Sequence, residues 1–271
     1  MTVTVLGAGG FIGAQLVRHL RAAGVDCQAP PRHDTGWLRR PLGHVVYAIG
    51  LTADFRARPL DTVEAHVCLL RRLLAEGDFE SLTYLSSTRV YSGASATHEA
   101  ARLVVDPNAP GDLYNLSKLM GESLCLHGGR ACTRVARLSN IVGLRPDPDI
   151  FIDQLLAEGC RSGRVQLRTA LASYKDYLWI DDAVALLARM AVSDQTGIFN
   201  VASGEAVSNA RIAEAIERGM GFAVTAAPDA PAWDFMPIAM ARTRQAFPFT
   251  PLAFDAYFPD YLRQYRRSKG L

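Results

Sequence analysis

Tyr114 and Lys118 lie four residues apart in a segment, 112–126, whose apolar pattern predicts an amphipathic helix. Residues at that spacing share one helix face, so the phenol and the ammonium can meet over a single patch. Lysine is rare in this chain: only positions 118, 175 and 269 carry it, among 29 basic residues. A compact ammonium can hydrogen-bond a ribose hydroxyl close to a phenol in a way that a wide guanidinium cannot. The pair is therefore a candidate for chemistry that needs a phenol and an ammonium side by side.

Tyr265 and Lys269 have the same spacing, so spacing alone does not identify a site. This second pair lies two residues from the C-terminus in a basic stretch, where a fraying tail is the simpler interpretation. The first pair is distinguished by the rest of the chain.

A hydroxyl group is predicted close to Tyr114. Residues 81–87 form an apolar run that is typical of a buried strand and ends in Ser86 and Ser87. A hydroxyl at the carboxyl end of such a strand can hydrogen-bond the same oxygen that the tyrosine contacts. Its structural alternative is a strand-end serine that hydrogen-bonds the backbone.

The N-terminal residues predict a dinucleotide site. A short apolar strand, 2–6, is followed by Gly7, Gly10 and Gly13 and then by an amphipathic helix to about residue 23. Glycines in this setting permit a tight turn, the approach of backbone N–H groups to a pyrophosphate, and close packing of the helix on the strand. The predicted cofactor-binding residues of this turn are Gly7, Gly10, Phe11, Ile12 and Gly13.

The second predicted strand comprises residues 25–29, and the residues that follow it indicate whether NAD or NADP binds. An acid there would hydrogen-bond the adenosine 2′-hydroxyl, whereas an arginine would accommodate a 2′-phosphate. Asp26 lies at the wrong end of the strand, Asp34 lies beyond Arg32, and Arg32 follows the strand directly. The sequence thus favours NADP over NAD, with Arg32 as the phosphate contact; the alternative is an ordinary loop arginine.

The spacing of the next elements predicts a reduced sheet. Residues 29–44 are too few for a full helix and strand, so the third strand is expected to be shortened or missing. The next strand, 44–50, ends at Gly50, and ligands of open parallel sheets bind at that end of the strands. Gly50 is therefore a further candidate for cofactor binding, and 59–75 is predicted to be one helix.

Composition excludes several classes of function. The 271 residues are 49% hydrophobic and carry a net charge of +2 without a run of five or more like charges, which argues against a nucleic-acid partner. Five dispersed cysteines without a Cys-x-x-Cys pair suggest reduced thiols, and the histidines form no metal-binding pattern. Neither a signal peptide nor a membrane-length apolar segment is evident. We expect a cytoplasmic protein with no metal and no membrane partner.

Six motifs in the same order along the chain resemble those of the extended short-chain dehydrogenases/reductases of the nucleotide-sugar epimerase/dehydratase family. The motifs are Gly7-x-x-Gly10-Phe-Ile-Gly13, Ser86-Ser-x-x-Val-Tyr91, Tyr114-x-x-Ser-Lys118-x-x-x-Glu122, Arg137-x-x-Asn140-x-x-Gly143, Asp176-Tyr-x-x-Ile-Asp-Asp182 and Phe199-Asn-Val-Ala-Ser-Gly204. Each is modest on its own, but together they span nearly the whole chain.

The resemblance implies a role for each candidate residue. Ser87, Tyr114 and Lys118 would be catalytic, with Tyr114 as the acid or base during hydride transfer and with Lys118 both holding the nicotinamide ribose and lowering the pKa of the phenol. Ser87, Thr88 and Asn140 would contact the substrate, a nucleotide sugar. For Asn140, a turn-forming asparagine after a strand is an open alternative.

Departures from the family pattern narrow the reaction. Dehydratases of the family carry an Asp-Glu pair directly after the catalytic hydroxyl, where this chain has Thr88 and Arg89. An epimerase or a 4-keto-sugar reductase is therefore favoured. The family's asparagine in the helix after the fourth strand is replaced within 64–68, and its arginine motif for the diphosphate is not evident. A reductase of a small non-nucleotide ketone, or a noncatalytic NAD(P)-sensing or RNA-associated protein, remains an alternative.

The resemblance also predicts the architecture, an α/β protein with a Rossmann-type, doubly wound, mostly parallel sheet and a small C-terminal substrate-binding lobe. The NAD(P)-binding domain would comprise 1–143 with 177–202, and the lobe 144–176 with 203–271. A homodimer is expected through the helices at about 60–75 and 112–128.

Overall fold

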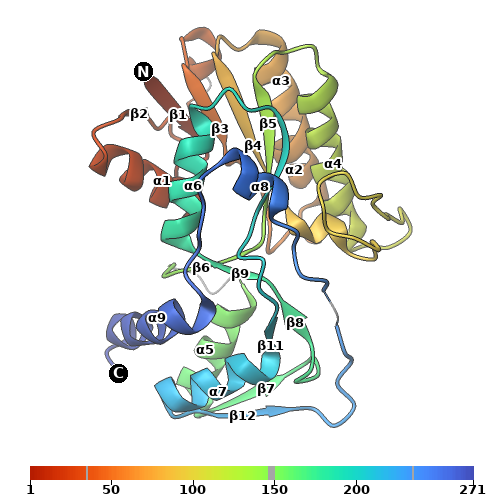
Figure 1. The fold of residues 1–271 in the computed structure, drawn as a ribbon, viewed down its shortest axis with the longest axis vertical. Coiled ribbons are helices and arrows are strands. Elements are labelled where there is room, and N and C mark those ends of the chain that lie inside the picture. The colour runs from red at the N-terminus through yellow and green to blue at the C-terminus, as the bar shows by residue number, and fades with distance from the viewer. Residues whose placement is uncertain (35, 146–149, 234) are drawn as a thin grey trace. The chain divides into compact units, whose positions relative to one another are not determined.

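The computed structural model describes residues 1–34, 36–145, 150–233 and 235–271. The chain forms two compact units. The first contains Met1–Leu138, Ile180–Val201 and Ala239–Phe249, and the second contains Ser139–Trp179, Ala202–Ile238 and Thr250–Leu271. Figure 1 shows the central sheet of the first unit with its labelled helices.

The first unit is built on a six-stranded sheet in the order β10-β5-β4-β3-β1-β2, and every pairing in it is parallel. Its strands are β1 (Thr2–Leu6), β2 (Asp26–Gln28), β3 (His44–Tyr47), β4 (Ser81–Ser87), β5 (Thr133–Leu138) and β10 (Gly197–Val201). The central strands are almost continuously buried, as expected of a parallel sheet covered on both faces.

Helices cover both faces of this sheet. Helix α1 (Phe11–Ala22) packs beside α6 (Ile180–Ala191), while α3 (Leu69–Glu76) packs beside α4 (Asp112–His127). The shorter helices of the unit are α2 (Pro59–Val63) and α8 (Ala241–Ala246). The predicted Rossmann-type, doubly wound fold is confirmed.

The third strand of the expected pattern is missing from the described residues. Between β2 and β3 the chain forms only a short 3-10 helix, Gly36–Arg39, whose Trp37 packs into the core beside Leu42. Strand β2 is therefore an edge of the sheet. The shortness of this connection, read from the sequence, is borne out.

The predicted single helix over 59–75 is interrupted by a π-helical turn, Glu64–Cys68, between α2 and α3. Two tyrosine hydroxyls explain the interruption: Tyr47 donates to the carbonyl oxygen of Ala65 at 2.6 Å, and Tyr84 donates to that of His66 at 3.3 Å. Side-chain donors that compete for helix carbonyls are a known cause of such local rearrangement. The segment is helical throughout, as predicted, but its apolar periodicity contains no sign of this competition and so did not reveal the π-helical turn.

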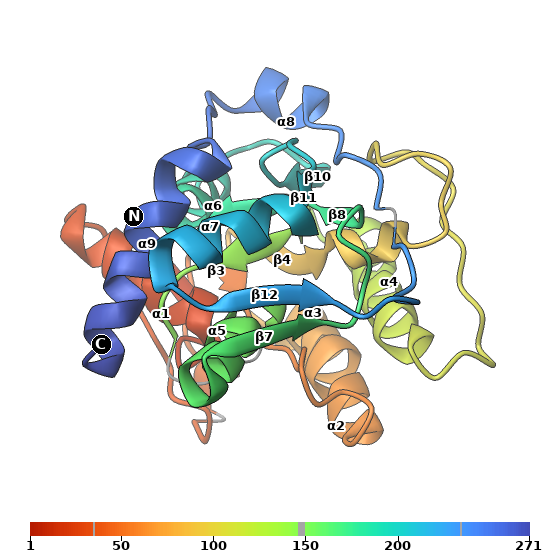
Figure 2. The same cartoon turned by 90° about the horizontal axis from the view of Figure 1, so that it is seen from below.

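The second unit has its own core and three small two-stranded pairings. The pairs are β6 (Asn140–Val142) with β9 (Tyr177–Trp179), β7 (Arg164–Leu167) with β12 (Ala223–Ala226), and β8 (Tyr174–Lys175) with β11 (Val207–Ser208). Helices α5 (Phe151–Ser162), α7 (Asn209–Met220) and α9 (Phe254–Lys269) supply most of the apolar core. Figure 2 shows β7 and β12 side by side. No helix within the described ranges is both long enough and apolar enough to span a membrane.

The observed units differ from the expected division mainly at two places, and Ala202 also lies in the second unit. Residues 139–143 and 177–179 lie in the second unit because β6 pairs with β9. Residues 239–249 lie in the first unit, where Thr243 donates to the carbonyl oxygen of Asn200 on β10 at 2.7 Å. Both differences arise from tertiary pairing, which the order of motifs along the chain does not reveal.

Candidate active site

The glycine turn between β1 and α1 contains two positions where a side chain cannot fit. Gly7 has a φ of +90°, and a Cβ placed on it would lie 2.6 Å from the carbonyl carbon of Ala48. A Cβ on Gly13 would lie 2.3 Å from the carbonyl oxygen of Gly7. These glycines are required for the turn itself and for the packing of the helix against it.

Gly10 differs from these two because protein packing does not require it. A Cβ on Gly10 would meet only the carbonyl oxygen of Gly7, at 3.4 Å, and one on Gly9 would meet no atom within 4 Å. Gly10 is the N-cap of α1, no side chain caps the helix there, and Phe11 and Ile12 begin its first turn. A twelve-residue helix that presents a bare backbone N-terminus suits the pyrophosphate of a dinucleotide.

The acids near the end of β2 are engaged within the protein. Asp26 accepts a hydrogen bond from Thr2 Oγ1 at 2.7 Å. Asp34 accepts one from the backbone N–H of Gly36 at 2.8 Å and forms an ion pair with Arg40, and these contacts lower its pKa. Arg32 is exposed. No carboxylate is therefore available directly after the strand to hold a ribose hydroxyl.

Ser87 and Tyr114 are brought together by β4 and α4. Ser87 is the last residue of β4, and Tyr114 lies in the first turn of α4 with 4% of its surface exposed. The hydroxyls of Ser87 and Thr52 are close enough to the phenol to lower its pKa as potential hydrogen-bond partners. Thr52 was not predicted, because it lies in an irregular segment after β3 that carries no motif. The structure therefore places two hydroxyls at the oxygen expected to exchange a proton.

Burial raises the pKa of the Tyr114 phenol, and the groups that oppose this effect are Ser87, Thr52 and Arg89. Lys118, which was expected to lower that pKa, is not among them. Its Nζ lies 5.9 Å from the centre of the Tyr114 ring and donates to the carbonyl oxygen of Leu85 at 2.9 Å. The effect of Lys118 on the phenol in the presence of the cofactor stays a prediction, and four-residue spacing brings the two side chains together without fixing the direction of the ammonium.

Lys118 itself is buried, and burial lowers its pKa to about 7, against an opposing effect of Glu122. A lysine of this kind exchanges its proton near neutral pH, so it can supply or accept a proton as well as hold a hydroxyl. Gly50 lies beside it: a Cβ on Gly50 would be 3.4 Å from Lys118 Nζ and 3.1 Å from His66 Nε2. The structure thus places Gly50 next to the lysine.

His66 is a residue of the site that the sequence did not identify. It is fully buried in the π-helical turn, and its ring packs edge-on against that of Tyr114 at 5.4 Å. The backbone N–H of Leu51 donates to Nε2 at 3.2 Å, so Nδ1 carries the proton and donates to Ser117 Oγ at 2.8 Å. Burial lowers the pKa of His66 to about 2. His66 is therefore a neutral group that ties the segment after β3 to α4.

A buried network beneath Tyr114 fixes α4 on the sheet. Glu122 accepts hydrogen bonds from Ser86 and Arg137, and Arg137 also donates to the hydroxyl of Tyr91. Tyr91 in turn donates to Asn200 Oδ1 on β10 at 2.8 Å. Four of the six sequence motifs thus meet in one chain of hydrogen bonds within the first unit.

The remaining predicted substrate residues lie in different surroundings. Thr88 is buried at the start of a 3-10 helix, Thr88–Tyr91, that follows Ser87. Asn140 lies in the second unit, where its Nδ2 donates to the carbonyl oxygen of Asp176 at 2.8 Å. Asp176 accepts hydrogen bonds from the backbone N–H groups of Ser203 and Gly204, so residues of three motifs stabilise that unit.

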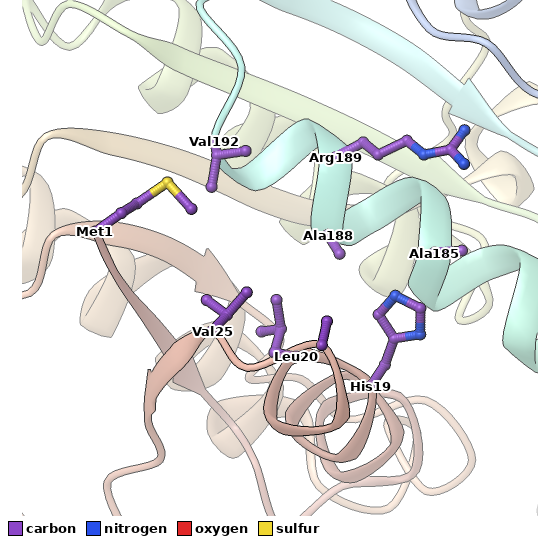
Figure 3. Close-up of a pocket in the computed structure, with 9 residues that line it drawn as sticks. Met1, His19, Leu20, Val25, Ala185, Ala188, Arg189 and Val192 are labelled. Carbon is purple, nitrogen blue, oxygen red and sulfur yellow. The ribbon is translucent and has the colours of Figure 1, made fainter.

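A cavity of about 270 Å³ lies between α1 and α6 (Figure 3). It is lined mainly by apolar side chains, with His19 and Arg189 among them, and Met1, which precedes β1, contributes to it. It therefore lies at the amino end of the parallel strands and contains none of the predicted site residues. In the described part of the chain no group of three or more His, Cys, Asp or Glu side chains could hold a metal ion.

Proteins of known structure share the fold of this chain. The chain is 21% identical to MoeE5, solved in complex with UDP-glucose and NAD, with a TM-score of 0.83 and 99% of each chain covered. It is 19% identical to the NAD dependent NDP-hexosamine 5,6-dehydratase TunA, with a TM-score of 0.82 and 98% of each chain covered. It is 23% identical to RMD from Pseudomonas aeruginosa, solved with NADPH, with a TM-score of 0.73 over 97% of this chain and 96% of that one. At these identities the likeness is one of fold.

The family assignment comes from the sequence itself. No curated protein matches the chain. The model of the NAD dependent epimerase/dehydratase family matches residues 3–202, which include the glycine turn, Ser87, Tyr114 and Lys118. This chain therefore belongs to the NAD dependent epimerase/dehydratase family, a group of NAD(P)-binding enzymes of the extended short-chain dehydrogenase/reductase type.

Proposed function

We propose that the protein is an NAD(P)-dependent oxidoreductase that acts on a nucleotide sugar, as an epimerase or as a 4-keto-sugar reductase. The observation that carries this proposal is the convergence of three side chains: the Ser87 hydroxyl lies near enough to lower the pKa of the Tyr114 phenol, and the buried Lys118 Nζ lies 5.9 Å from the centre of the Tyr114 ring. Similar proteins of known structure have been solved with UDP-glucose, with UDP-glucuronic acid and with NAD.

Each side chain has a defined task in this reaction. Tyr114 exchanges a proton with the hydroxyl or carbonyl oxygen of the substrate, while Ser87 and Thr52 hold that oxygen in line with the phenol. Lys118 holds the nicotinamide ribose, and its lowered pKa lets it pass a proton toward the phenol at neutral pH. When bound, NAD(P) supplies the hydride acceptor or donor at nicotinamide C4.

The residues after Ser87 argue against dehydration. Loss of water from a sugar needs an acid and a base beside the ring, and the positions that would supply them hold Thr88 and Arg89. Thr88 is buried and neutral, and Arg89 stays protonated. Redox chemistry at one carbon, without elimination, is what these side chains can support.

We also propose a preference for NADP(H), with Arg32 as the contact to the 2′-phosphate. The support is local: Asp26 and Asp34 are both engaged within the protein, and Arg32 is exposed after β2. Structures of this fold occur with either cofactor, as MoeE5 with NAD and RMD with NADPH illustrate. The ratio of kcat/KM for NADPH to that for NADH should fall at least tenfold in Arg32→Ala. An unchanged ratio would show that Arg32 does not contact the 2′-phosphate.

The decisive test of the function is turnover of candidate 4-keto and 4-hydroxy nucleotide sugars by the wild type and by Tyr114→Phe. We expect the substitution to lower kcat by about 10²–10⁴-fold, the range of general acid–base catalysis, while cofactor binding is retained. A reductase consumes NAD(P)H with every turnover, as absorbance at about 340 nm reports, whereas an epimerase interconverts its sugars with no net change. Full activity of Tyr114→Phe would refute the proposed mechanism.

A further inference from the structure

Two guanidinium groups converge beside Tyr114. Arg89 Cζ lies 5.4 Å from the centre of the Tyr114 ring and 5.1 Å from that of Phe55, and Arg56 Cζ lies 4.6 Å from the Phe55 ring. The Nη2 atoms of Arg56 and Arg89 lie 3.3 Å and 3.4 Å from one point, the position that a Cβ on Gly111 would occupy. The two cations are therefore neighbours, and one of them faces the catalytic phenol.

No carboxylate of the described residues forms an ion pair with either arginine, although the charge of Asp112 raises the pKa of Arg89. By contrast, Arg58, two residues after Arg56, is paired with both Asp54 and Asp61. The nearby Asp112 is occupied by the backbone N–H of Asp106 and by the side chain of Asn115. Burial and the charge of Arg56 both lower the pKa of Arg89. Since guanidinium groups stay protonated, two of them held this close repel each other, and an anion between them would relieve the repulsion.

The pair is tied to the reacting groups. Ser87 Oγ accepts a hydrogen bond from the backbone N–H of Arg89 at 3.2 Å, so Arg89 is fixed to the catalytic hydroxyl. Phe55 is buried against the Tyr114 ring at 5.4 Å, three residues after Thr52, whose hydroxyl lowers the pKa of the phenol. An anion held by these arginines lies close to the carbon that exchanges hydride, rather than at a distant part of the substrate.

The stacking of the guanidinium groups suits a ligand. A guanidinium that packs through its face on an aromatic ring keeps its edge donors for hydrogen bonds, and its planar fork matches a carboxylate. The Arg56 side chain is exposed, so its contact with Phe55 does not serve to bury the arginine. Among the described residues the guanidinium of Arg89 donates one hydrogen bond, to the carbonyl oxygen of Gly111 at 3.3 Å, which leaves further donors of its fork for a ligand.

We propose that Arg56 and Arg89 form a subsite for a carboxylate on the sugar ring of the substrate, next to the carbon oxidised or reduced at Tyr114. The inference rests on the proposed function and specifies its substrate class as a nucleotide-linked sugar acid. The diphosphate of such a substrate is attached at the anomeric carbon, away from the reacting centre, so it is the ring carboxylate that reaches Arg89.

The test uses matched pairs of nucleotide sugars that differ only in a carboxylate or a hydroxymethyl group at C6, on uridine, thymidine, guanosine and cytidine diphosphates. Binding to the full-length Tyr114→Phe variant, saturated with cofactor, is measured by calorimetry. On the nucleotide that binds best, the sugar acid should bind at least tenfold more tightly than the neutral sugar, as expected of one charge-assisted contact. Arg89→Gln and Arg56→Gln, added separately, should each reduce this ratio to below about threefold.

Arg58→Gln is the matched control, because Arg58 lies in the same segment but is paired with two aspartates. It should leave the ratio unchanged. Arg56 is exposed, so its substitution tests the subsite even where Arg89→Gln does not fold.

Three results would overturn the subsite. The neutral sugar binding as tightly as the acid would exclude it. Equal weakening of both sugars and of the free nucleoside diphosphate would place the arginines at the diphosphate instead. In the Tyr114-containing enzyme, a shift in the pH profile of kcat that is the same for both sugars, with no change in their ratio, would assign Arg89 to tuning the phenol. Binding of the cofactor but of no nucleotide sugar would refute the proposed function as a whole.

Discussion

The carboxylate of Glu122 and the guanidinium of Arg137 form a two-pronged ion pair with side chains only 4% and 3% exposed. Arg137 Nη2 lies 2.6 Å from Oε2, and Arg137 Nε lies 3.0 Å from Oε1. Glu122 is one helical turn beyond Lys118, and Arg137 is on β5. This pair therefore fixes the helix that carries Tyr114 and Lys118 to the sheet.

Glu122→Gln should destabilise the protein by about 3–5 kcal/mol, since it leaves the buried Arg137 without its counter-charge. The free energy of unfolding from urea titration measures the effect. Glu214→Gln is the control: it breaks an exposed ion pair with Arg218, and a change within about 0.5 kcal/mol is expected. Replacing both partners, as Glu122→Met with Arg137→Met, should recover much of the loss. A cost below about 1 kcal/mol for Glu122→Gln would mean that the buried pair does not hold the helix in place.

Lys118→Met should stabilise the cofactor-free protein at neutral pH. The pKa of Lys118 is about 7 in the folded protein, against 10.5 ordinarily, so the unfolded chain binds more protons between these values. Wild-type stability should therefore rise with pH from 7 to 10.5, by up to about 1.4 kcal/mol per unit from this group. The advantage of Lys118→Met should shrink over the same range. Lys269→Met, at an exposed position, serves as control, and a pH-independent difference for Lys118→Met would contradict the burial argument.

His66→Asn should make the protein less sensitive to acid. The unfolded chain protonates this histidine near pH 6.5, whereas the folded protein resists protonation down to about pH 2. The unfolded state thus binds more protons between these values, and wild-type stability should fall as pH is lowered from 6.5, by up to about 1.4 kcal/mol per unit from this group. An asparagine oxygen can still accept from the N–H of Leu51. Parallel stability curves for wild type and variant below pH 6 would show that His66 is not held neutral.

Gly10→Ala and Gly13→Ala should separate cofactor binding from folding. An alanine at position 13 would place its Cβ 2.3 Å from the carbonyl oxygen of Gly7, so we expect a loss of about 1–3 kcal/mol from overpacking. At position 10 the Cβ only touches that oxygen, and stability should change by less than about 1 kcal/mol. Gly10→Ala should nevertheless weaken NAD(P) binding at least tenfold, because the methyl group occupies the place where the pyrophosphate approaches. If a calorimetric titration of Gly10→Ala showed unchanged affinity for NAD(P), the pyrophosphate would not bind at Gly10.

Local patterns in the sequence predicted the parts of the site whose residues are close together in the chain. The glycine turn was predicted because Gly7 and Gly13 each meet a steric demand within one strand, turn and helix. The Tyr114 and Lys118 pair was predicted because helical spacing places both on one face. Motif order then indicated that Ser87 and Tyr114 belong to one site, and in the structure the Ser87 hydroxyl is near enough to lower the pKa of the Tyr114 phenol.

The rest could not be predicted because it depends on contacts between distant segments. Thr52 and His66 reach Tyr114 only once α4 packs beside the segment that follows β3. The π-helical turn exists because Tyr47 and Tyr84 on the sheet donate to its carbonyl oxygens. The apolar periodicity of 59–75 does not indicate these contacts. Arg89 was visible only as a departure from the family's pattern; its partner Arg56 had no signal of any kind.

The missing third strand also affects how the edge of the sheet can pair with strands of other protein chains. Because the sheet stops at β2, its outermost strand is only three residues long and is followed at once by Pro30 and Pro31. Proline lacks the N–H that strand pairing requires, and a short edge offers few backbone groups to a foreign strand. The shortened connection therefore also protects this side of the sheet from edge-to-edge aggregation.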